Sequence, residues 1–365
     1  MSELAVGAAY YRACRRHLPD PTTGTADDLR CTQLRDRIAA AIDAEECPSG
    51  WPVFNPAGYA EQLAMKAALV RSSFPEVAAV EVFGSPVDKH RMRCKVGVVG
   101  SESAATLRYA DIEGRMDVLD IACSGIQAAM PVVLEAARAE PQLRRNLSMM
   151  SFLGTRDGAD VIACLVYGAP LDPGEWRAAA ERVQAAWPVG RGCISLIGQA
   201  RGQRVVSGAE FLRETYRLSD GRRLAYKHVF GHFSNPNAFA CEQTLDWLSG
   251  AVRSLVPEAE RQKRDLLELY CGNGNHTVAL APLFRRALAV EINPSLCAAA
   301  EENLMANGVS NALVQRSPSA AFCSRVLRRR TWKHAASGSE LDFCAVLVDP
   351  PRAGLDALTL GLVAK

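Results

Sequence analysis

The sequence lacks long apolar runs and any large excess of charge. No stretch approaches the run of about 18 apolar residues that a membrane-spanning helix needs, and the N-terminus, Met1-Ser2-Glu3, lacks the apolar core of a secretory signal. The 365 residues include 42 Lys and Arg against 40 Asp and Glu, a net charge of +2. We therefore expect no membrane partner, and any RNA-binding surface must be a local basic patch.

Paired-cysteine motifs are missing as well, although the chain has 12 cysteines. They are scattered singly from Cys14 to Cys344, no two have C-x-x-C spacing, and no His/Cys cluster has the spacing of a zinc site. This pattern favours reduced, buried thiols and argues against a disulfide scaffold, a metal site or an iron–sulfur cluster. A reducing compartment follows, with the cytoplasm favoured and an organelle left open.

The sequence predicts three segments. Residues 1–50, with Pro19 and Pro21, form a weakly ordered N-terminal extension. Residues 51–228 alternate short apolar runs with polar turns and helical patterns, which predicts a mixed α+β domain. Residues 229–365 repeat strand and helix, and their strands are apolar throughout, which is typical of an α/β domain with a parallel sheet covered on both faces.

Local signals place several elements. Asp172 and Pro173 predict a helix start, with the aspartate as N-cap and the proline at the first helical position. Ser124 is expected to cap a helix over residues 127–139. The apolar runs expected to form strands are Val77–Phe83, Cys94–Val99, Val161–Tyr167, Cys193–Ile197, Asp265–Leu269, Ala287–Glu291, Ala312–Gln315 and Cys344–Val348.

The most informative stretch follows the strand at Asp265–Leu269. A tight turn with Gly272 and Gly274 leads directly into a helix, and glycines there let the backbone turn sharply and approach a ligand closely. Glu291 closes the next strand, at the distance where a carboxylate can accept hydrogen bonds from both ribose hydroxyls of an adenosyl ligand. The spacing indicates a nucleotide site.

Two classes of ligand use such a turn. A dinucleotide site needs the third glycine of G-x-G-x-x-G, and Thr277 occupies that position. S-adenosylmethionine has no phosphate and needs an acid near its ammonium group, which Glu268 with Asn273 and Asn275 suits better. Asp349 begins an Asp-Pro-Pro motif after the fourth strand, where it lies beside the ligand unless the motif is only a turn.

These motifs resemble one family, the bacterial-type tRNA (uracil-5-)-methyltransferases, which make 5-methyluridine in the T-loop. The runs LLELYCGNGN at 266–275 and VDPPRAGL at 348–355 look like that family's signatures almost letter for letter, and the resemblance covers roughly residues 55–365. Further matches are Tyr59-x-x-Gln62-Leu63-x-x-Lys66, Ser85-Pro86-Val87, Arg91-Met92-Arg93, Glu175-Trp176, Leu196-Ile197-Gly198 and Phe233-x-Asn235-Pro236-Asn237.

The resemblance implies a class I S-adenosylmethionine methyltransferase domain of Rossmann-like α/β fold, incomplete at its C-terminus and preceded by a mixed α+β RNA-recognition domain. It also implies S-adenosyl-L-methionine as cofactor, the T-arm of tRNA as partner, a monomer, and RNA contacts at Arg91 and Arg93. Asn235 stands where the family usually has Gln, and His276 where it usually has Phe. The cofactor contacts expected are Asn235, Tyr270, Gly272, Asn275, Glu291 and Asp349.

Carbon 5 of uracil is a weak nucleophile, and the resemblance implies a covalent solution. A cysteine thiolate adds at C6, C5 then attacks the sulfonium methyl group, and a carboxylate base removes the C5 proton. The target base must leave its stack to reach the pocket. The family carries the cysteine in a Ser-Cys-Asn-Pro loop and the base in a Glu-Cys-Gly segment, both expected beyond Lys365. No residue of this chain is therefore expected to be catalytic, and Cys271 and Cys344 are interpreted as core thiols.

We further expect a sheet with fewer strands than the family's, in which Cys344–Val348 forms an exposed apolar edge and the chain as given is poorly stable and inactive in methyl transfer. Two alternatives stay open. One is a non-catalytic protein of the same descent that binds RNA or the cofactor. The other is a methyltransferase that acts on a substrate other than RNA. The sequence also leaves open which uridine is the target.

Overall fold

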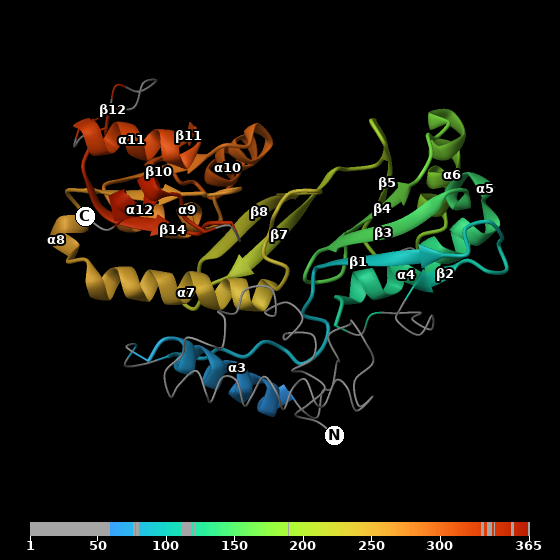
Figure 1. Ribbon diagram of the computed structural model, residues 1–365, viewed down its shortest axis with the longest axis horizontal. Helices are drawn as coiled ribbons and strands as arrows, with labels where there is room; N and C mark the ends of the chain where they lie inside the picture. The colour runs from blue at the N-terminus through green and yellow to red at the C-terminus, as the bar shows by residue number, and fades with distance from the viewer. Residues whose placement is uncertain are drawn as a thin grey trace, which may run out of the picture. The chain divides into compact units, whose positions relative to one another are not determined.

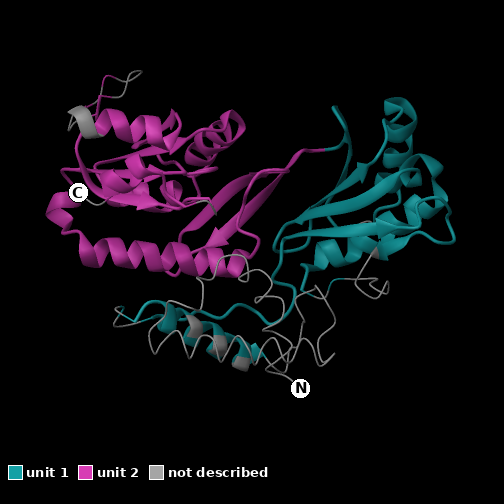
Figure 2. Cartoon of the chain, viewed as in Figure 1, with its two compact units in different colours: residues 1–208 teal, residues 209–365 magenta. Residues whose placement is uncertain are grey.

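The fold consists of two compact units. The computed structural model describes residues 59–75, 77, 80–110, 119, 121–188, 190–329, 332–333, 338, 340–351 and 354–363 (Figure 1). Contacts divide the chain at Gly208 and Ala209 into a first unit and a second unit (Figure 2). The second unit starts ahead of the domain limit expected at residue 228, because a hairpin over 211–229 belongs to it. The expected extension over 1–50 lies outside the described residues.

The first unit is built on a six-stranded mixed sheet. Its strand order is β2-β1-β3-β4-β5-β6; β4 and β5 pair in parallel, and every other neighbouring pair is antiparallel. The mixed sheet expected from the sequence is confirmed. The strands are β1 (Arg93–Val99), β2 (Arg108–Ala110), β3 (Leu147–Gly154), β4 (Val161–Tyr167), β5 (Ile194–Ala200) and β6 (Gln203–Ser207).

The helices of the first unit include α6, which begins as the sequence predicts. Asp172 is its N-cap and accepts a hydrogen bond from the backbone N–H of Glu175 at 2.8 Å, with proline at the next position. Trp176 of α6 is buried and donates its indole N–H to the hydroxyl of Tyr167 on β4 at 2.8 Å, which holds the helix to the sheet. The helices are α3 (Tyr59–Ser73), α4 (Ser124–Ala139), α5 (Pro141–Arg144) and α6 (Pro173–Ala185).

Two local predictions in this unit are wrong. Ser124 does not cap α4, because it is the first helical residue and Cys123 is the N-cap, whose side chain makes no capping hydrogen bond. The strand expected at Val77–Phe83 does not form over 80–83, and Val82 and Phe83 are 41% and 49% exposed. An apolar run becomes a strand only where a neighbouring strand takes up its backbone hydrogen bonds, and the sequence of the run alone does not contain that partner.

The second unit contains a parallel four-stranded sheet. Its order is β11-β10-β9-β14, so β9 lies between two neighbours, and all five of its residues are buried. β14 is the outermost strand of this sheet in the described part of the chain, as expected, but only its Val346 is exposed (38%), and its other residues are partly buried. The strands are β9 (Asp265–Leu269), β10 (Arg286–Glu291), β11 (Ala312–Arg316) and β14 (Phe343–Val348).

Helices and short strands complete the second unit. A hairpin of β7 (Phe211–Arg217) and β8 (Arg223–Val229) precedes the sheet, and its antiparallel pairing runs along the whole of both strands. The remaining elements are α7 (Ala238–Leu255), α8 (Glu258–Arg261), α9 (Asn275–Leu280), a 3-10 turn (Ala281–Leu283), α10 (Pro294–Ala306), α11 (Ser319–Arg329), β12 (Trp332–Lys333), β13 (Glu340–Leu341) and α12 (Ala357–Val363).

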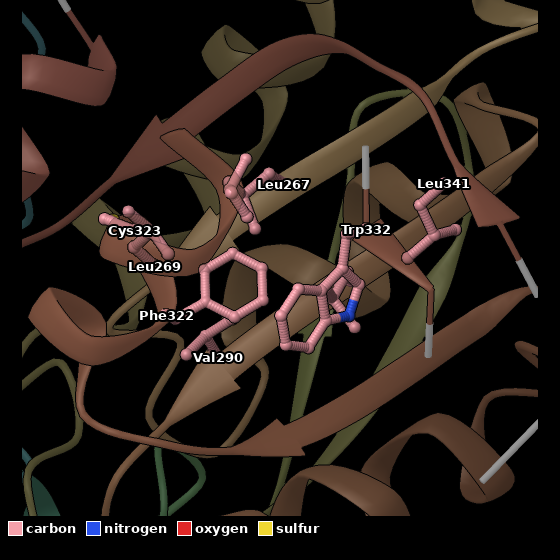
Figure 3. Packing of buried hydrophobic residues seen from close by; sticks show 9 residues of the cluster. Leu267, Leu269, Val290, Phe322, Cys323, Trp332 and Leu341 are labelled. Atoms are coloured by element: carbon pink, nitrogen blue, oxygen red, sulfur yellow. The ribbon is translucent and has the colours of Figure 1, made fainter. Parts of the chain in front are cut away.

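Residues of β9 alternate between two apolar cores, one on each face of the sheet. Leu267 and Leu269 pack with Phe322 of α11 and Trp332, whose ring centroids are 4.6 Å apart (Figure 3). Leu266 points to the other face, into a cluster that includes the end of α9. The expected parallel sheet covered on both faces is confirmed. Because both faces are covered, the carboxyl ends of its strands lie at the edge of the sheet.

Candidate cofactor site

Three strands of the second unit end at the same level. Leu269 of β9 pairs with Val290 of β10 and Val348 of β14. The residues that follow these three in the chain are Tyr270 after Leu269, Glu291 after Val290 and Asp349 after Val348. Because the register is parallel, these three expected cofactor residues emerge along one carboxyl edge of the sheet, where ligands bind in open α/β folds.

The turn after β9 has an unusual backbone. Tyr270 has φ +61°, which is rare for a residue with a side chain, and Gly272 and Gly274 have φ +57° and +76°. A β-carbon at Gly274 would lie 3.2 Å from the Cβ of Ala300 on α10, so that position also needs glycine for close packing. The positive φ angles let the chain turn directly from β9 into α9, and within the turn Gly272 is partly exposed while Asn273 and Gly274 are buried.

Glu291 holds the turn from the neighbouring strand. One carboxylate oxygen accepts the N–H of Gly272 at 3.1 Å, and the other accepts the N–H groups of Ile292 and Asn293 at 2.9 and 2.8 Å. The residue is 8% exposed. Two carboxylate oxygens can accept about four hydrogen bonds, so the bonds to the backbone still leave acceptor capacity for a ribose hydroxyl.

A second carboxylate lies beneath the turn. Glu268 of β9 is fully buried, accepts the hydroxyl of Thr277 in a short hydrogen bond, and contacts Nδ1 of His276 at 3.3 Å. Burial lowers the pKa of His276, but the hydrogen bond and charge of Glu268, with a contribution from Asp349, outweigh it and raise the pKa. Glu268 thus favours the protonated form of His276, and the family's usual Phe at this position would leave that carboxylate with one partner fewer.

Tyr270 is oriented by a residue that the sequence analysis did not single out. Its hydroxyl donates to a carboxylate oxygen of Asp356 at 3.2 Å. Asp356 also accepts the N–H and hydroxyl of Thr359, which lower its pKa together with the Tyr270 bond, and so it caps α12. An aspartate just before a short helical run is an N-cap signal that can be recognised in the sequence.

Asn275 and Asn235 are both engaged in hydrogen bonds. The side-chain amide of Asn275 faces Cys241 of α7, with its Nδ2 3.3 Å from the sulfur. The backbone carbonyl of Asn275 accepts the hydroxyl of Tyr226 at 2.8 Å. The Asn235 side chain accepts the N–H of Asn237 at 3.0 Å. That Asn235 and Asn275 contact a cofactor stays a prediction.

The two cysteines weighed as nucleophiles are both held as thiols. Burial raises the pKa of Cys271 well above its ordinary value, and the carboxylates of Glu268 and Glu291 raise it further. Burial also raises the pKa of Cys344, whose side chain packs against an apolar cluster of the second unit. A thiol is a far weaker nucleophile than a thiolate.

Arg91 and Arg93 alternate with buried residues at the start of β1. Arg91 is exposed and Arg93 half-buried, with Met92 buried between them, and Lys95 continues the same side of the strand. The guanidinium of Arg91 donates to the carbonyl of Arg93 at 2.9 Å. Burial, reinforced by the charge of Arg91, lowers the pKa of Arg93. The cations share one face; their contact with RNA stays a prediction.

The chemistry of the site suits an adenosyl group better than a phosphate. The ends of β9, β10 and β14 present a tyrosine and two carboxylates, and the turn between them carries no cation. Among the described residues, no group of three or more His, Cys, Asp or Glu side chains could hold a metal ion. In the same part of the chain no helix is both long and apolar enough to cross a bilayer.

Comparison with known proteins gives a family match over most of the chain. The model of the family described as tRNA (Uracil-5-)-methyltransferase matches residues 58–365. The tRNA/tmRNA (uracil-C(5))-methyltransferase of Azoarcus sp. (strain BH72) is 38% identical over 326 residues, which cover 86% of this chain and 85% of that protein. The protein of the same description from Chromohalobacter salexigens is 36% identical over 321 residues, with 84% and 82% covered.

A solved structure agrees on the fold. Pyrococcus abyssi tRNA (uracil-54, C5)-methyltransferase, in complex with S-adenosyl-L-homocysteine, matches with a TM-score of 0.57 and 18% identity. The match covers 84% of this chain and 70% of that one. The Rossmann-like methyltransferase fold expected from the sequence is confirmed.

Proposed function

Because the chain belongs to the tRNA (uracil-5-)-methyltransferase family, we propose that it binds S-adenosyl-L-methionine for methylation of uridine C5 in tRNA. The observation that carries the proposal is the common level of three strand ends, at which Glu291 bonds the glycine turn through Gly272. The match to the family model runs through both units, which argues against a methyltransferase for substrates other than RNA.

The cofactor supplies an electrophilic methyl group, and the residues of this chain bind and orient it. Glu291 accepts three backbone N–H groups, so its remaining acceptor capacity suits one ribose hydroxyl. The glycine turn gives the ligand a close backbone approach, and Tyr270, oriented by Asp356, offers an aromatic surface. Asp349 places a negative charge near the cationic end of the ligand.

The partner proposed is the T-arm of tRNA, with Arg91 and Arg93 of the first unit at its phosphates. Two cations spaced two residues apart, the exposed Arg91 just before β1 and the half-buried Arg93 at its first position, suit successive phosphate groups better than a single buried anion. We further propose that the protein acts as a monomer. We also propose that it acts in the cytoplasm, which the scattered, unpaired cysteines support. The nine cysteines in the described ranges are free thiols.

Calorimetry with S-adenosyl-L-homocysteine tests the cofactor site directly. No Ser-Cys-Asn-Pro run occurs in the sequence, so ligand binding is the readout for this chain. E291Q should weaken binding by about 10- to 100-fold, because it removes a charge-assisted acceptor worth about 1.5–3 kcal/mol. The matched control, E301Q, changes an exposed glutamate on α10 and should leave the affinity unchanged.

Two results would overturn the proposal. One is a folded, wild-type chain that gives no heat with the ligand. The other is equal affinity in wild type and E291Q. A T-arm hairpin that binds no better than a hairpin of scrambled sequence would overturn the RNA partner while leaving the cofactor site intact.

A further inference from the structure

The outer edge of β8 is bonded to side chains instead of a third strand. β8 pairs with β7 along one edge. On the other edge, the backbone N–H of Ala225 donates to Oδ1 of Asn307 at 2.8 Å, and Nδ2 of Asn307 donates to the carbonyl of Ala225 at 2.7 Å. A side-chain amide has the donor and acceptor of a peptide group, so Asn307 completes the edge as a neighbouring strand would.

One helical turn earlier on α10, the side-chain amide of Asn303 also bonds the edge of β8, and in addition it bonds the glycine turn. Its Oδ1 accepts the N–H of Lys227 on β8 at 2.7 Å, and its Nδ2 donates to the carbonyl of Asn273 in the glycine turn at 2.9 Å. Asn273 in turn donates its own side-chain amide to the carbonyl of Lys227 at 3.0 Å. Three bonds thus form a closed ring that joins a helix, a strand and the turn.

This ring, which we call the amide ring (Asn303, Asn273 and Lys227), is shielded from water. Asn303 is 1% exposed and Asn273 is 7% exposed. Inside a protein, such hydrogen bonds face little competition from solvent, and a donor or acceptor left without a partner costs about 1–3 kcal/mol. Water therefore does not readily replace the hydrogen bonds of the amide ring.

The turn is fixed from two directions. On one side Glu291 accepts the N–H of Gly272. On the other side α10 contacts the turn twice, through Ala300 packed against Gly274 and through Asn303 bonded to the carbonyl of Asn273. Glycine peptide units have broad conformational freedom, so without these two anchors the turn would populate several backbone arrangements.

We propose that Asn303 is a positioning residue: it acts on cofactor binding without contacting the cofactor. Its amide joins the glycine turn to β8 and so holds the turn in the backbone conformation that binds the cofactor. The inference rests on the proposed function, since it concerns the same cofactor site. If removing the lock lets the binding arrangement fall to about a tenth of the population, the apparent affinity falls about tenfold. That change equals about 1.4 kcal/mol, the size of one buried hydrogen bond.

Asn307 provides the matched control. N303D and N307D both replace an amide that donates to a backbone carbonyl, and both keep an acceptor for an N–H of β8. Asn303 is buried and Asn307 is partly buried. Only Asn303 is bonded to the turn. Both variants should lower the unfolding temperature, whereas only N303D should raise the Kd for S-adenosyl-L-homocysteine, by about tenfold.

Protonation gives a readout that a purely structural role would not produce. A neutral carboxyl can donate to the carbonyl of Asn273 as the amide does, whereas an ionised one cannot. Burial at this position raises the pKa of the introduced carboxyl above its ordinary value. The affinity of N303D relative to wild type, measured by calorimetry from pH 8 down to pH 5.5, should therefore recover as the pH falls. N307D, relative to wild type, should show no such trend.

N273A tests the same ring from the side of the turn and covers the case in which N303D does not fold. It removes the bond to Lys227 and should also weaken binding about tenfold, and the N303D/N273A double variant should lose little more than either single variant. Affinities of N303D and N273A equal to that of N307D, or additive losses in the double variant, would refute the role of Asn303. A wild-type chain that binds no ligand would instead refute the proposed function.

Discussion

Gly272 and Gly274 differ in a way that predicts different costs for the same substitution. Both have positive φ, +57° and +76°, so alanine at either one meets the left-handed penalty of about 1–2 kcal/mol. At Gly272 a β-carbon would have no atom within 4 Å, whereas at Gly274 it would lie 3.2 Å from the Cβ of Ala300. G274A should therefore cost about 1–3 kcal/mol more than G272A, the usual range for overpacking.

The assay is urea unfolding of the full chain with and without S-adenosyl-L-homocysteine. Because the chain has two compact units, unfolding can show two transitions. The transition that the ligand shifts belongs to the unit that contains the cofactor site. The third variant is A300G, alone and combined with G274A. Removing the opposing methyl group should recover most of the extra cost, after correction for glycine within a helix, about 1 kcal/mol.

Equal destabilisation of the two alanine variants, or a G274A/A300G variant as unstable as G274A, would contradict the steric contact between position 274 and Ala300. Equal costs would mean that α10 moves away from the turn easily, contrary to its anchoring by Asn303. In that case both the steric estimate and the proposed lock on the turn lose their basis.

The remaining predictions concern charge. Because Glu268 raises the pKa of His276 above its ordinary 6.5, the pair's contribution to stability is fully present below that pH and is lost as the pH rises through the raised value. H276F should thus reduce stability, measured by urea unfolding, more at pH 5.5 than at pH 8.5; an equal loss at both would contradict the pairing. R91E/R93E should weaken T-arm hairpin binding, measured by fluorescence anisotropy, and lower the salt slope by about two, with ligand affinity unchanged. An unchanged slope would remove these arginines from the RNA surface.

Much of the second unit could be predicted from its sequence because its signals are local. The apolar run Asp265–Leu269, the two glycines and the acid at Glu291 each act within a few residues of chain, and each forms what was expected. The strand expected at Val77–Phe83 failed because pairing depends on a partner elsewhere in the chain.

The contacts that hold the site together were harder to predict. Asn303 and Asn307 bond to backbone groups, which every residue has, so no pattern in the sequence marks their partners. The left-handed backbone of Tyr270 was equally hidden, since residues with side chains seldom adopt it. Its partner Asp356 could have been predicted, because an aspartate directly before a helical run is a typical N-cap.

The asparagines bonded to β8 also affect whether the hairpin can pair with another strand. A strand with open N–H and C=O groups along one side is a template on which another extended chain can assemble. Side-chain amides of α10 occupy the N–H and C=O of Ala225 and the N–H of Lys227, and the side-chain amide of Asn273 in the glycine turn occupies the C=O of Lys227. Neither a helix nor a tight turn can extend a sheet. The two-stranded ribbon is thereby closed to growth on that side, and intermolecular strand addition is blocked at the segment that supports the glycine turn.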